Sequence, residues 1–317
     1  MTDRSRVTAI VNPAAGGDGD RAVAALTAAD TAEVDVVRTT ASGVAADIAY
    51  KFAAGDARPD LVVAVGGDGT VGEVATGLYR AVESGVVGVP PLLVAPAGTG
   101  NSCYRGMWDD IPFEDVLRVA LRGGAAVRSL DLARIEENEH IMLLGSGSGL
   151  FAASLVATRS RTETGRELLM AAALAAMETY EPYSGRVVVD GEVLYEGGVV
   201  ETIVGGFRYR GGLLNLVPES VLDDGLLDVT LVTTAADMTQ FARAAMHGCV
   251  YDVPGIRWGR GVRITIERTD GEPILFEHDG EVMPRATSAY TSSVLPAALR
   301  VLTLPEPQPW FQGRGPC

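Results

Sequence analysis

Short apolar runs alternate with longer amphipathic stretches over roughly the first 128 residues. Runs rich in branched apolar residues predict strands at 7–11, 34–37, 61–65 and 92–95. The intervening stretches predict helices at 20–29, 44–53, 71–82 and 113–121. The last of these is the clearest, because its apolar residues recur on one helical face. This alternation of strands and helices predicts an α/β domain with a parallel sheet and helices on both faces.

The pattern changes after about residue 127, where strand-like runs follow one another. Residues 186–195 predict a hairpin around Asp190-Gly191, and residues 263–267 and 273–276 predict a second one around Asp270-Gly271. Further strands are expected at 226–232 and 298–304, with one helix at 166–178. The chain of 317 residues is therefore expected to form a nucleotide-binding domain at 1–128 and a mainly antiparallel β domain at 129–304, with the tail 305–317 returning to the first.

Composition narrows the class of protein. Apolar residues make up 47% of the chain and charged residues 21%, as in an ordinary globular protein. The formal net charge of −15 argues against nucleic acid as a partner and against strong electrostatic adhesion to an anionic bilayer. Three widely spaced cysteines imply no disulfide framework, and residues 1–6 lead into a strand-like run, not a secretory segment. A cytoplasmic protein is expected.

One loop carries the strongest chemical signal. The apolar run 62–65 leads directly into Gly66-Gly67-Asp68-Gly69-Thr70, and a helical stretch follows at once. Glycines let backbone amides approach a ligand, and a helix N-terminus attracts anions, so this loop predicts a phosphate site. Thr70 and Glu73 have the spacing of a capping box. Because Asp68 would repel phosphates, we infer that Mg²⁺ lies between them.

Two other loops follow predicted parallel strands and carry Asn, Gly or Thr: 12–17 and 96–101. In open parallel sheets, ligands bind at the carboxyl ends of the strands, so three such loops together predict one ligand site. Asn12 and Asn101 suit ribose or adenine edges, but turn formation through their side chains is an equally good interpretation. The loops lack both the Gly-Lys-Ser/Thr ending of the Walker phosphate loop and the Gly-x-Gly-x-x-Gly dinucleotide pattern.

The combination of motifs resembles the diacylglycerol kinase catalytic-domain family, which includes sphingosine and ceramide kinases and soluble bacterial lipid kinases. The resemblance rests on Asn12-Pro13…Gly16, on 66–70 with Glu73, on 96–101, on 205–212 with 222–229, and on Asp279-Gly280-Glu281. It implies an ATP-dependent kinase that phosphorylates a lipid hydroxyl such as that of diacylglycerol. It also implies a phosphofructokinase-like domain and a β-rich domain, with the site in the cleft between them.

The resemblance also implies roles for particular residues. Glu281 matches the general base, which would accept the proton of the lipid hydroxyl, although without the resemblance a solvated hairpin residue would be the favoured interpretation. Asp68 would act in catalysis and hold Mg²⁺, with Asp131 supporting the metal region. A second metal site would comprise Asp224 and the backbone carbonyls of Val221 and Leu226, but a simple turn is an almost equal alternative. The expected ATP-binding residues are Asn12, Gly66, Gly67, Gly69, Thr70, Gly98, Thr99 and Asn101.

One departure from the family pattern leaves the acceptor open. Ser102 follows Asn101 where the family usually has Asp, so the substrate need not be diacylglycerol. Two other hypotheses remain: a phosphotransferase like NAD kinase, which shares a Gly-Gly-Asp-Gly loop, and a nucleotide-binding protein without catalysis. The expected partners are ATP and a lipid alcohol, with transient peripheral contact to a membrane surface. A homodimer is left open.

Overall fold

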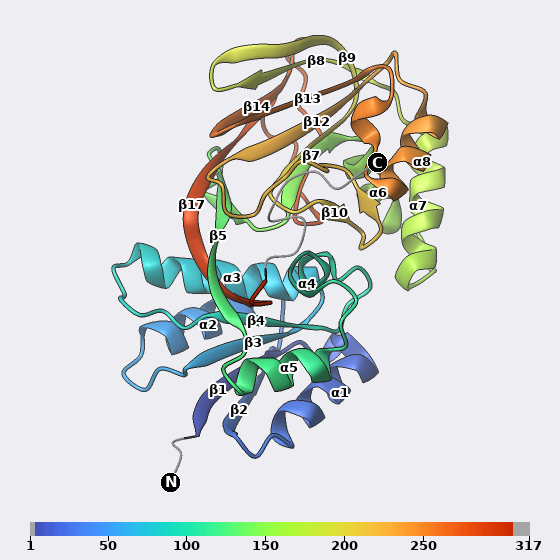
Figure 1. Ribbon diagram of the computed structural model, residues 1–317. Coiled ribbons are helices and arrows are strands. Elements are labelled where there is room, and N and C mark those ends of the chain that lie inside the picture. Colours follow the sequence, from blue (N-terminus) through green and yellow to red (C-terminus); the bar gives the residue numbers. More distant parts are fainter. Residues whose placement is uncertain (1–3, 307–317) are drawn as a thin grey trace. The chain divides into compact units, whose positions relative to one another are not determined.

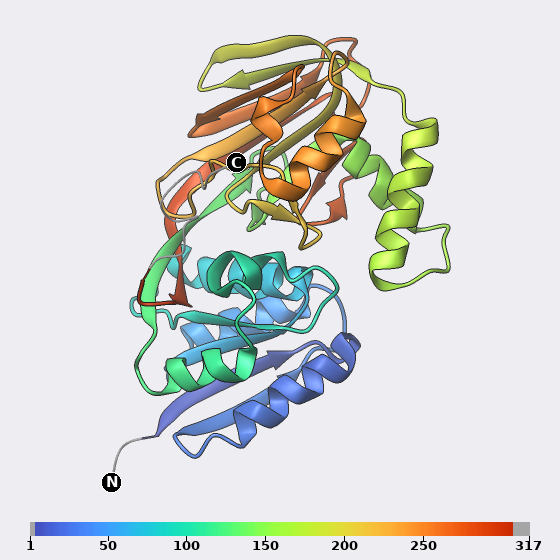
Figure 2. The same ribbon diagram turned by 45° about the vertical axis from the view of Figure 1, so that its right-hand side comes forward.

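The computed structural model describes residues 4–306, which fall into two compact units (Figures 1 and 2). Unit 1 contains residues up to Leu130 together with the segment that begins at Ala297, and unit 2 contains Asp131–Pro296. The division lies two residues after the expected boundary at 128, and the return to unit 1 begins before residue 305. The expected course of the tail lies largely outside the described residues, because 307–317 are not among them.

Unit 1 is a parallel sheet with strand order β2-β1-β3-β4. Its strands are β1 (Ser5–Val11), β2 (Ala32–Arg38), β3 (Leu61–Gly66) and β4 (Leu92–Pro96). The end of β17 (Ala289–Thr303) adds to β4 in parallel, with Val301 opposite Leu92. This pairing explains why 297–303 belong to unit 1, although the sequence pattern suggested the β-rich domain.

Helices cover both faces of this sheet. The helices are α1 (Gly16–Thr27), α2 (Val44–Ala54), α3 (Asp68–Glu83), α4 (Ser102–Trp108) and α5 (Phe113–Leu121), with a short 3-10 turn at Pro13–Ala15. α1 packs with α5 on one face, and α2 packs with α3 on the other (Figure 1). All six residues of β3 are buried, as expected for a strand covered on both sides. The predicted α/β architecture is confirmed.

Unit 2 is mainly antiparallel, which confirms the second half of the predicted fold class. The main path runs β16-β15-β7-β9-β8-β14-β17, and β12 joins β9 to β13. The strands are β5 (Ala126–Ile135), β6 (His140–Met142), β7 (Gly145–Gly149), β8 (Tyr183–Val189), β9 (Glu192–Gly205), β10 (Tyr209–Arg210), β11 (Leu214–Asn215), β12 (Leu227–Thr233), β13 (Ile256–Gly261), β14 (Arg263–Arg268), β15 (Phe276–His278) and β16 (Glu281–Val282). The helices are α6 (Leu150–Thr158), α7 (Gly165–Thr179) and α8 (Met238–His247), with a 3-10 turn at Val250–Asp252.

Of the two predicted hairpins, the first is confirmed and the second is wrong. β8 and β9 pair around Asp190 and Gly191, whose φ angles of 50° and 89° suit a two-residue turn. In contrast, β14 pairs with β8 and β17, so both of its edges are occupied. The segment after Asp270-Gly271 therefore joins a different part of the sheet, where β15 pairs with β7 and β16.

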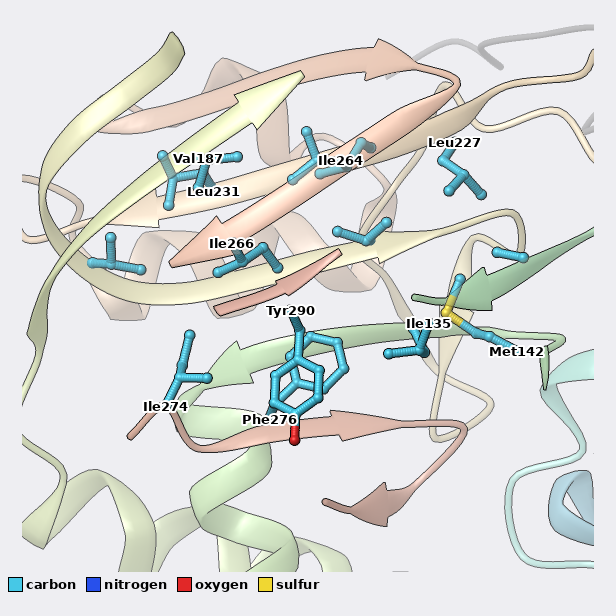
Figure 3. Close-up of a cluster of buried hydrophobic side chains, with 14 of the residues drawn as sticks. Ile135, Met142, Val187, Leu227, Leu231, Ile264, Ile266, Ile274, Phe276 and Tyr290 are labelled. Carbon is cyan, nitrogen blue, oxygen red and sulfur yellow. The ribbon is translucent and has the colours of Figure 1, made fainter. Parts of the chain in front are cut away.

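A buried apolar cluster anchors β15 inside unit 2 (Figure 3). The rings of Phe276 and Tyr290 stack with centroids 4.3 Å apart, and Ile266 and Ile274 belong to the same cluster. Because side chains alternate along a strand, Phe276 enters this core while Glu277 faces the other side. The core thus holds one face of the strand that leads to Asp279-Gly280-Glu281.

Candidate functional site

The loops after β1 and β3 are joined by a side chain. Asn12 Nδ2 donates to Thr70 Oγ1 at 3.1 Å, and Asn12 Oδ1 accepts the N–H of Ala14 at 2.9 Å. The backbone N–H of Asn12 also donates to Val65 O at 2.9 Å. Turn formation, one of the two interpretations left open for Asn12, is therefore what its side chain does here. Its contact with Thr70 brings the first two predicted loops together.

The loops after β3 and β4 touch backbone to backbone. A Cβ on Gly98 would lie 2.3 Å from Gly67 Cα, so only glycine allows this approach. A Cβ on Gly66 would lie 2.6 Å from the side chain of Thr70. The side chain of Asn101 closes its own loop, since it accepts the N–H of Gly98 and donates to Gly98 O, both at 2.9 Å. All three predicted loops thus form one packed assembly in unit 1.

Asp68 makes contacts that the sequence does not reveal. Its Oδ2 accepts the N–H of Ser102 and its Oδ1 accepts the N–H of Cys103, each at 3.0 Å. Both amides belong to the first turn of α4, so Asp68 caps a helix other than its own. Its charge is therefore stabilised without a metal, which weakens the inference of Mg²⁺ from repulsion alone. Each carboxylate oxygen has two lone pairs, so these bonds still leave capacity for a cation.

Ser102, which stands where the family usually has Asp, is almost completely buried. Its backbone N–H donates to Asp68, and α4 begins at this residue. Sequence patterns missed α4 because nearly every side chain in it is buried, which removes the amphipathic signal.

The predicted capping box at the start of α3 is wrong. The helix begins at Asp68, not at residue 71, and Glu73 instead serves the start of α2. The carboxylate of Glu73 accepts the N–H of Gly43 at 2.8 Å and that of Ala45 at 3.1 Å. The N-cap residue of α3 is Gly67, which has no side chain that could cap the helix. That turn therefore presents amide donors beside Gly66 and Gly67, as an anion site requires.

The residues predicted to bind metal fall into two separate groups. Asp68 belongs to unit 1, whereas Asp131 belongs to unit 2, where its Oδ2 accepts the N–H of Gly225 at 2.6 Å. Asp131 also donates its N–H to Leu222 O at 2.8 Å. Asp131 thus braces the turn that contains Asp224, and its support of the metal region at Asp68 stays a prediction.

The turn at Asp224 already has a positive neighbour. Asp224 Oδ1 accepts the N–H of Leu226 at 3.1 Å, and its Oδ2 lies 3.6 Å from Arg260 Nη1. Arg260 also pairs with the fully buried Asp228 at 3.1 Å. Because a divalent cation would compete with Arg260 for Asp224, the second metal site, with the carbonyls of Val221 and Leu226, stays a prediction. Within residues 4–306, no three acidic, histidine or cysteine side chains are grouped to hold a metal.

Glu281 follows a firmly held two-residue turn. Asp279 and Gly280 have φ angles of 48° and 85°, and His278 pairs with Glu281 across the turn. The carboxylate of Asp279 accepts three backbone N–H groups, from Leu143 at 2.8 Å, Leu144 at 2.7 Å and Gly145 at 3.0 Å. Glu281 itself is exposed. The turn thus presents an accessible carboxylate on a rigid backbone, as a positioned proton acceptor requires.

A histidine pair flanks this turn. His140 Nδ1 lies 3.0 Å from His278 Nε2, and His278 is buried while His140 is not. Burial lowers the pKa of His278, which favours its neutral ring. No local sequence pattern could pair these two histidines, because 138 positions separate them.

Three other ionisable residues near the turn were assigned no role from the sequence: Glu201, Glu277 and Arg210, which lies within the 205–212 motif. Both glutamates are buried, and burial raises the pKa of each. The alternating glycines of β7, Gly-Ser-Gly-Ser-Gly, could have predicted such a group. A strand whose residues on one face are all glycine leaves room there for large side chains from neighbouring strands.

Comparison with known proteins shows similarity to one family along most of the chain. Residues 6–135 match the diacylglycerol kinase catalytic domain, and residues 146–303 match the YegS C-terminal NAD kinase beta sandwich-like domain. The chain is thus similar to members of the diacylglycerol kinase catalytic-domain family. These two matches cover both units of the fold.

The chain also resembles named relatives. It is 29% identical over 188 residues to a diacylglycerol kinase of Bacillus subtilis, covering 59% of each protein, less than two thirds of that relative's length. It is 29% identical over 254 residues to the probable lipid kinase YegS of Escherichia fergusonii, covering 77% of this chain and 78% of the relative. These names support a lipid kinase of this family.

Solved structures from Bacillus anthracis str. Sterne share the fold. One, with 25% identity, has a TM-score of 0.74 over 96% of this chain and 97% of its own. Another, described as a diacylglycerol kinase, has a TM-score of 0.69 at 23% identity, over 96% of this chain and 99% of its own.

Proposed function

We propose that this protein transfers the γ-phosphate of ATP to the hydroxyl of a lipid alcohol such as diacylglycerol. The observation that carries the proposal is the assembly of three glycine loops around the first turn of α3. Asn12 joins Thr70, Gly67 contacts Gly98, and Asp68 contacts the start of α4. Similarity to this family and the names of the relatives support the lipid hydroxyl as the acceptor.

The loops of unit 1 would bind the nucleotide. Amide groups at the start of α3 would donate to the phosphates, and the helix dipole there favours negative charge. The proposed contacts come from Gly66, Gly67, Gly69 and Thr70, with Gly98, Thr99 and Asn101 on the neighbouring loop. Thr70 Oγ1 is already bonded to Asn12 and Asn101 is bonded to Gly98, so these two side chains shape the loops as well.

Asp68 is the residue of unit 1 that would contact Mg²⁺. A hard oxygen ligand suits this ion, which usually completes its coordination with phosphate oxygens and water. When bound, Mg²⁺ would neutralise phosphate charge during transfer. The hydrogen bonds from Ser102 and Cys103 would hold the carboxylate of Asp68 in one orientation toward the phosphates.

Glu281 would act as the general base. The lipid hydroxyl oxygen forms a bond to the γ-phosphorus, the bond from that phosphorus to the β–γ bridging oxygen breaks, and ADP leaves. The hydroxyl proton passes to the Glu281 carboxylate. The loops belong to unit 1, and Glu281 belongs to unit 2.

The assay that tests this function uses labelled ATP, Mg²⁺, a bacterial lipid extract and NAD in one mixture, with products identified by mass spectrometry. We expect a phosphorylated lipid. Phosphorylated NAD would show an NAD kinase-like enzyme, and ATP binding without any transfer would show a nucleotide-binding protein; either result would overturn the proposal.

Glu281→Gln tests the base. We expect turnover to fall by about 10²–10⁴-fold, the range for losing proton transfer assistance, with ATP binding unchanged. Thermal unfolding should also be unchanged, because Glu281 is exposed. Glu272→Gln is the matched control, since Glu272 is another exposed glutamate of unit 2. If Glu281→Gln retained most of its activity, another residue would have to accept the proton.

The apolar face of α7 is the proposed contact with a membrane surface. Met170, Leu174 and Met177 lie on one helical face and are 64%, 57% and 51% exposed. The buried Ala172 and Ala176 lie on the helix that packs against α6. No helix of residues 4–306 is long and apolar enough to cross a bilayer. Such a face would bind reversibly at the surface of a bilayer.

Changing Met170 and Leu174 to serine should weaken binding to uncharged phosphatidylcholine vesicles by about tenfold or more, since each removes buried apolar area at the interface. Turnover of a short-chain, water-soluble diacylglycerol should stay the same. Val87→Ser is the control, because Val87 is 86% exposed and lies in unit 1. Equal vesicle binding by the double variant and the wild type would contradict the proposed contact.

A further inference from the structure

Glu201, Arg210 and Glu277 gather over the glycine face of β7. Glu277 lies opposite Gly147, and Glu201 lies opposite Gly149 on the other side of β7. Residues paired across a sheet share a face, and alternate residues of one strand do so too. The two glutamates therefore lie on the same face, separated by glycines that carry no side chain.

The bare face of β7 is what makes room for these groups. A Cβ on Gly145 would lie 1.6 Å from Arg210 Nη2, and a Cβ on Gly147 would lie 3.4 Å from Glu201 Oε1. Arg210 is held there by its hydrogen bonds to the carbonyls of Val204 and Phe207, both at 3.1 Å. The guanidinium and the carboxyl thus occupy the space that side chains of β7 would otherwise fill.

Glu277 connects this niche to the turn before Glu281. Its Oε2 accepts the N–H of Gly280 at 3.0 Å, and only 7% of Glu277 is exposed. On the opposite face of β15, Phe276 is locked into the core against Tyr290 (Figure 3). The carboxylate of Glu277 is therefore held by the position of its own strand, β15, and by its hydrogen bond from Gly280, the residue that precedes Glu281.

The surrounding charges set the ionisation of Glu277. Burial raises its pKa to about 7, while Arg210 and the bond from Gly280 favour the ionised form and Asp279 opposes it. Burial also raises the pKa of Glu201 well above its usual range, and the charge of Glu277 raises it further. The Oε2 atom of Glu201 accepts the N–H of Phe151 at 2.5 Å. Among the described residues its buried Oε1 has no hydrogen-bond partner.

We propose that Glu277 is a positioning residue, whose ionised carboxylate beside Arg210 fixes the Asp279-Gly280 turn and so directs Glu281 toward the acceptor hydroxyl. The inference rests on the proposed function of Glu281 as the base. A hydrogen bond to an ionised acceptor is about twice as strong as one to a neutral acceptor. Protonation of Glu277 therefore loosens the turn, and turnover falls as the medium becomes more acidic through the neutral range.

The first experiment observes the turn without any activity. In protein labelled with ¹⁵N-glycine, the amide resonance of Gly280 is assigned by its disappearance in Gly280→Ala and followed from pH 5 to pH 9. We expect it to move with a midpoint near the pKa of Glu277, about 7, and to stay still in Glu277→Gln. A Gly280 resonance that does not titrate in the wild type would overturn the proposal.

The second experiment separates charge from hydrogen bonding. Glu277→Gln keeps an acceptor for Gly280, so it should keep turnover within about tenfold but lose the acid-side decline near neutrality. Glu277→Leu removes the acceptor and should lower kcat by about 10²-fold, the scale of a small misplacement of a catalytic group, with the KM for ATP unchanged. An unchanged kcat in Glu277→Leu would overturn the proposal.

A matched control excludes a general effect of instability. Leu231→Ala opens a cavity in the buried core of unit 2 and does not alter the turn. It should lower thermal stability while keeping the pH profile of the wild type. If Leu231→Ala also lost the decline near neutrality, the effect would not belong to Glu277. If the wild type phosphorylated no lipid, the proposed function would fail, yet the Gly280 titration would still report on the turn.

Discussion

Asp68→Ala should destabilise unit 1 as well as abolish catalysis. The variant removes the acceptor of two hydrogen bonds, from Ser102 N and Cys103 N, each 3.0 Å long. Replacing a helix-capping carboxylate by Ala costs about 0.5–2 kcal/mol, and bonds to charged groups lie in the range of about 1.5–3 kcal/mol each. Since Asp68 is half-buried and water can replace part of the loss, we expect about 2 kcal/mol in total.

The measurement is the free energy of unfolding in urea, together with calorimetric titration of ATP at fixed Mg²⁺. A loss of about 2 kcal/mol corresponds to a Tm about 4–8 °C lower for a domain of this size. Asp68→Asn keeps an oxygen that can accept one amide, so it should lose about half as much stability. Both variants should lose Mg²⁺-dependent ATP binding.

Asp237→Ala is the matched control for Asp68. Asp237 caps α8 by accepting the N–H of Thr239 at 2.8 Å and that of Gln240 at 3.1 Å, and it has no proposed role in the reaction. Asp237→Ala should lower the free energy of unfolding by about 1 kcal/mol, as expected for the loss of an exposed helix cap, and should leave ATP binding unchanged. If Asp68→Ala unfolded at the same urea concentration as the wild type, its bonds to α4 would not stabilise the fold and the reasoning would be refuted.

Two further predictions concern stability. Gly98→Ala forces a Cβ to within 2.3 Å of Gly67 Cα, so it should lower the free energy of unfolding by about 1–3 kcal/mol and weaken ATP binding. Gly206→Ala is the control, because its Cβ would meet no atom within 4 Å, and calorimetry should show a smaller loss of stability. Because the pKa of Glu277 is raised from 4.5 to about 7, the folded state binds a proton more tightly than the unfolded state, so stability falls as pH rises through that window. The decline amounts to about 3 kcal/mol in the wild type, and Glu277→Gln should abolish it and be more stable than the wild type at pH 8. If the stability of both proteins fell in parallel with pH, this prediction would be contradicted.

Most of the fold follows from local patterns. The four parallel strands of unit 1 were predicted from apolar runs, and α5 was predicted at 113–121, where it lies. α6 was missed because it is apolar around most of its circumference, and α4 because it is buried. α8 could have been found, since Asp237 and Gly248 mark its two ends.

The candidate site was predicted as a set of loops, but not as a set of contacts. The sequence placed Asn12, Asp68 and Asn101 near one sheet edge, because parallel strands end together there. It did not show that Asp68 bonds to α4 or that Glu73 bonds to the start of α2. Such partners lie 28–35 positions apart, and no local pattern encodes a pairing at that distance.

The chain by itself determined the two kinds of architecture and the identity of the loops that we propose to bind phosphate, because periodicity and glycine content act locally along the backbone. Only the tertiary structure decided how carboxylates are used. In the folded protein Asp68 accepts hydrogen bonds from the start of α4, Asp131 accepts one from the turn that contains Asp224, and the buried Glu277 accepts one from Gly280. The physical reason is that the role of a carboxylate depends on its burial and on the donors around it, and both are supplied by segments distant in the sequence.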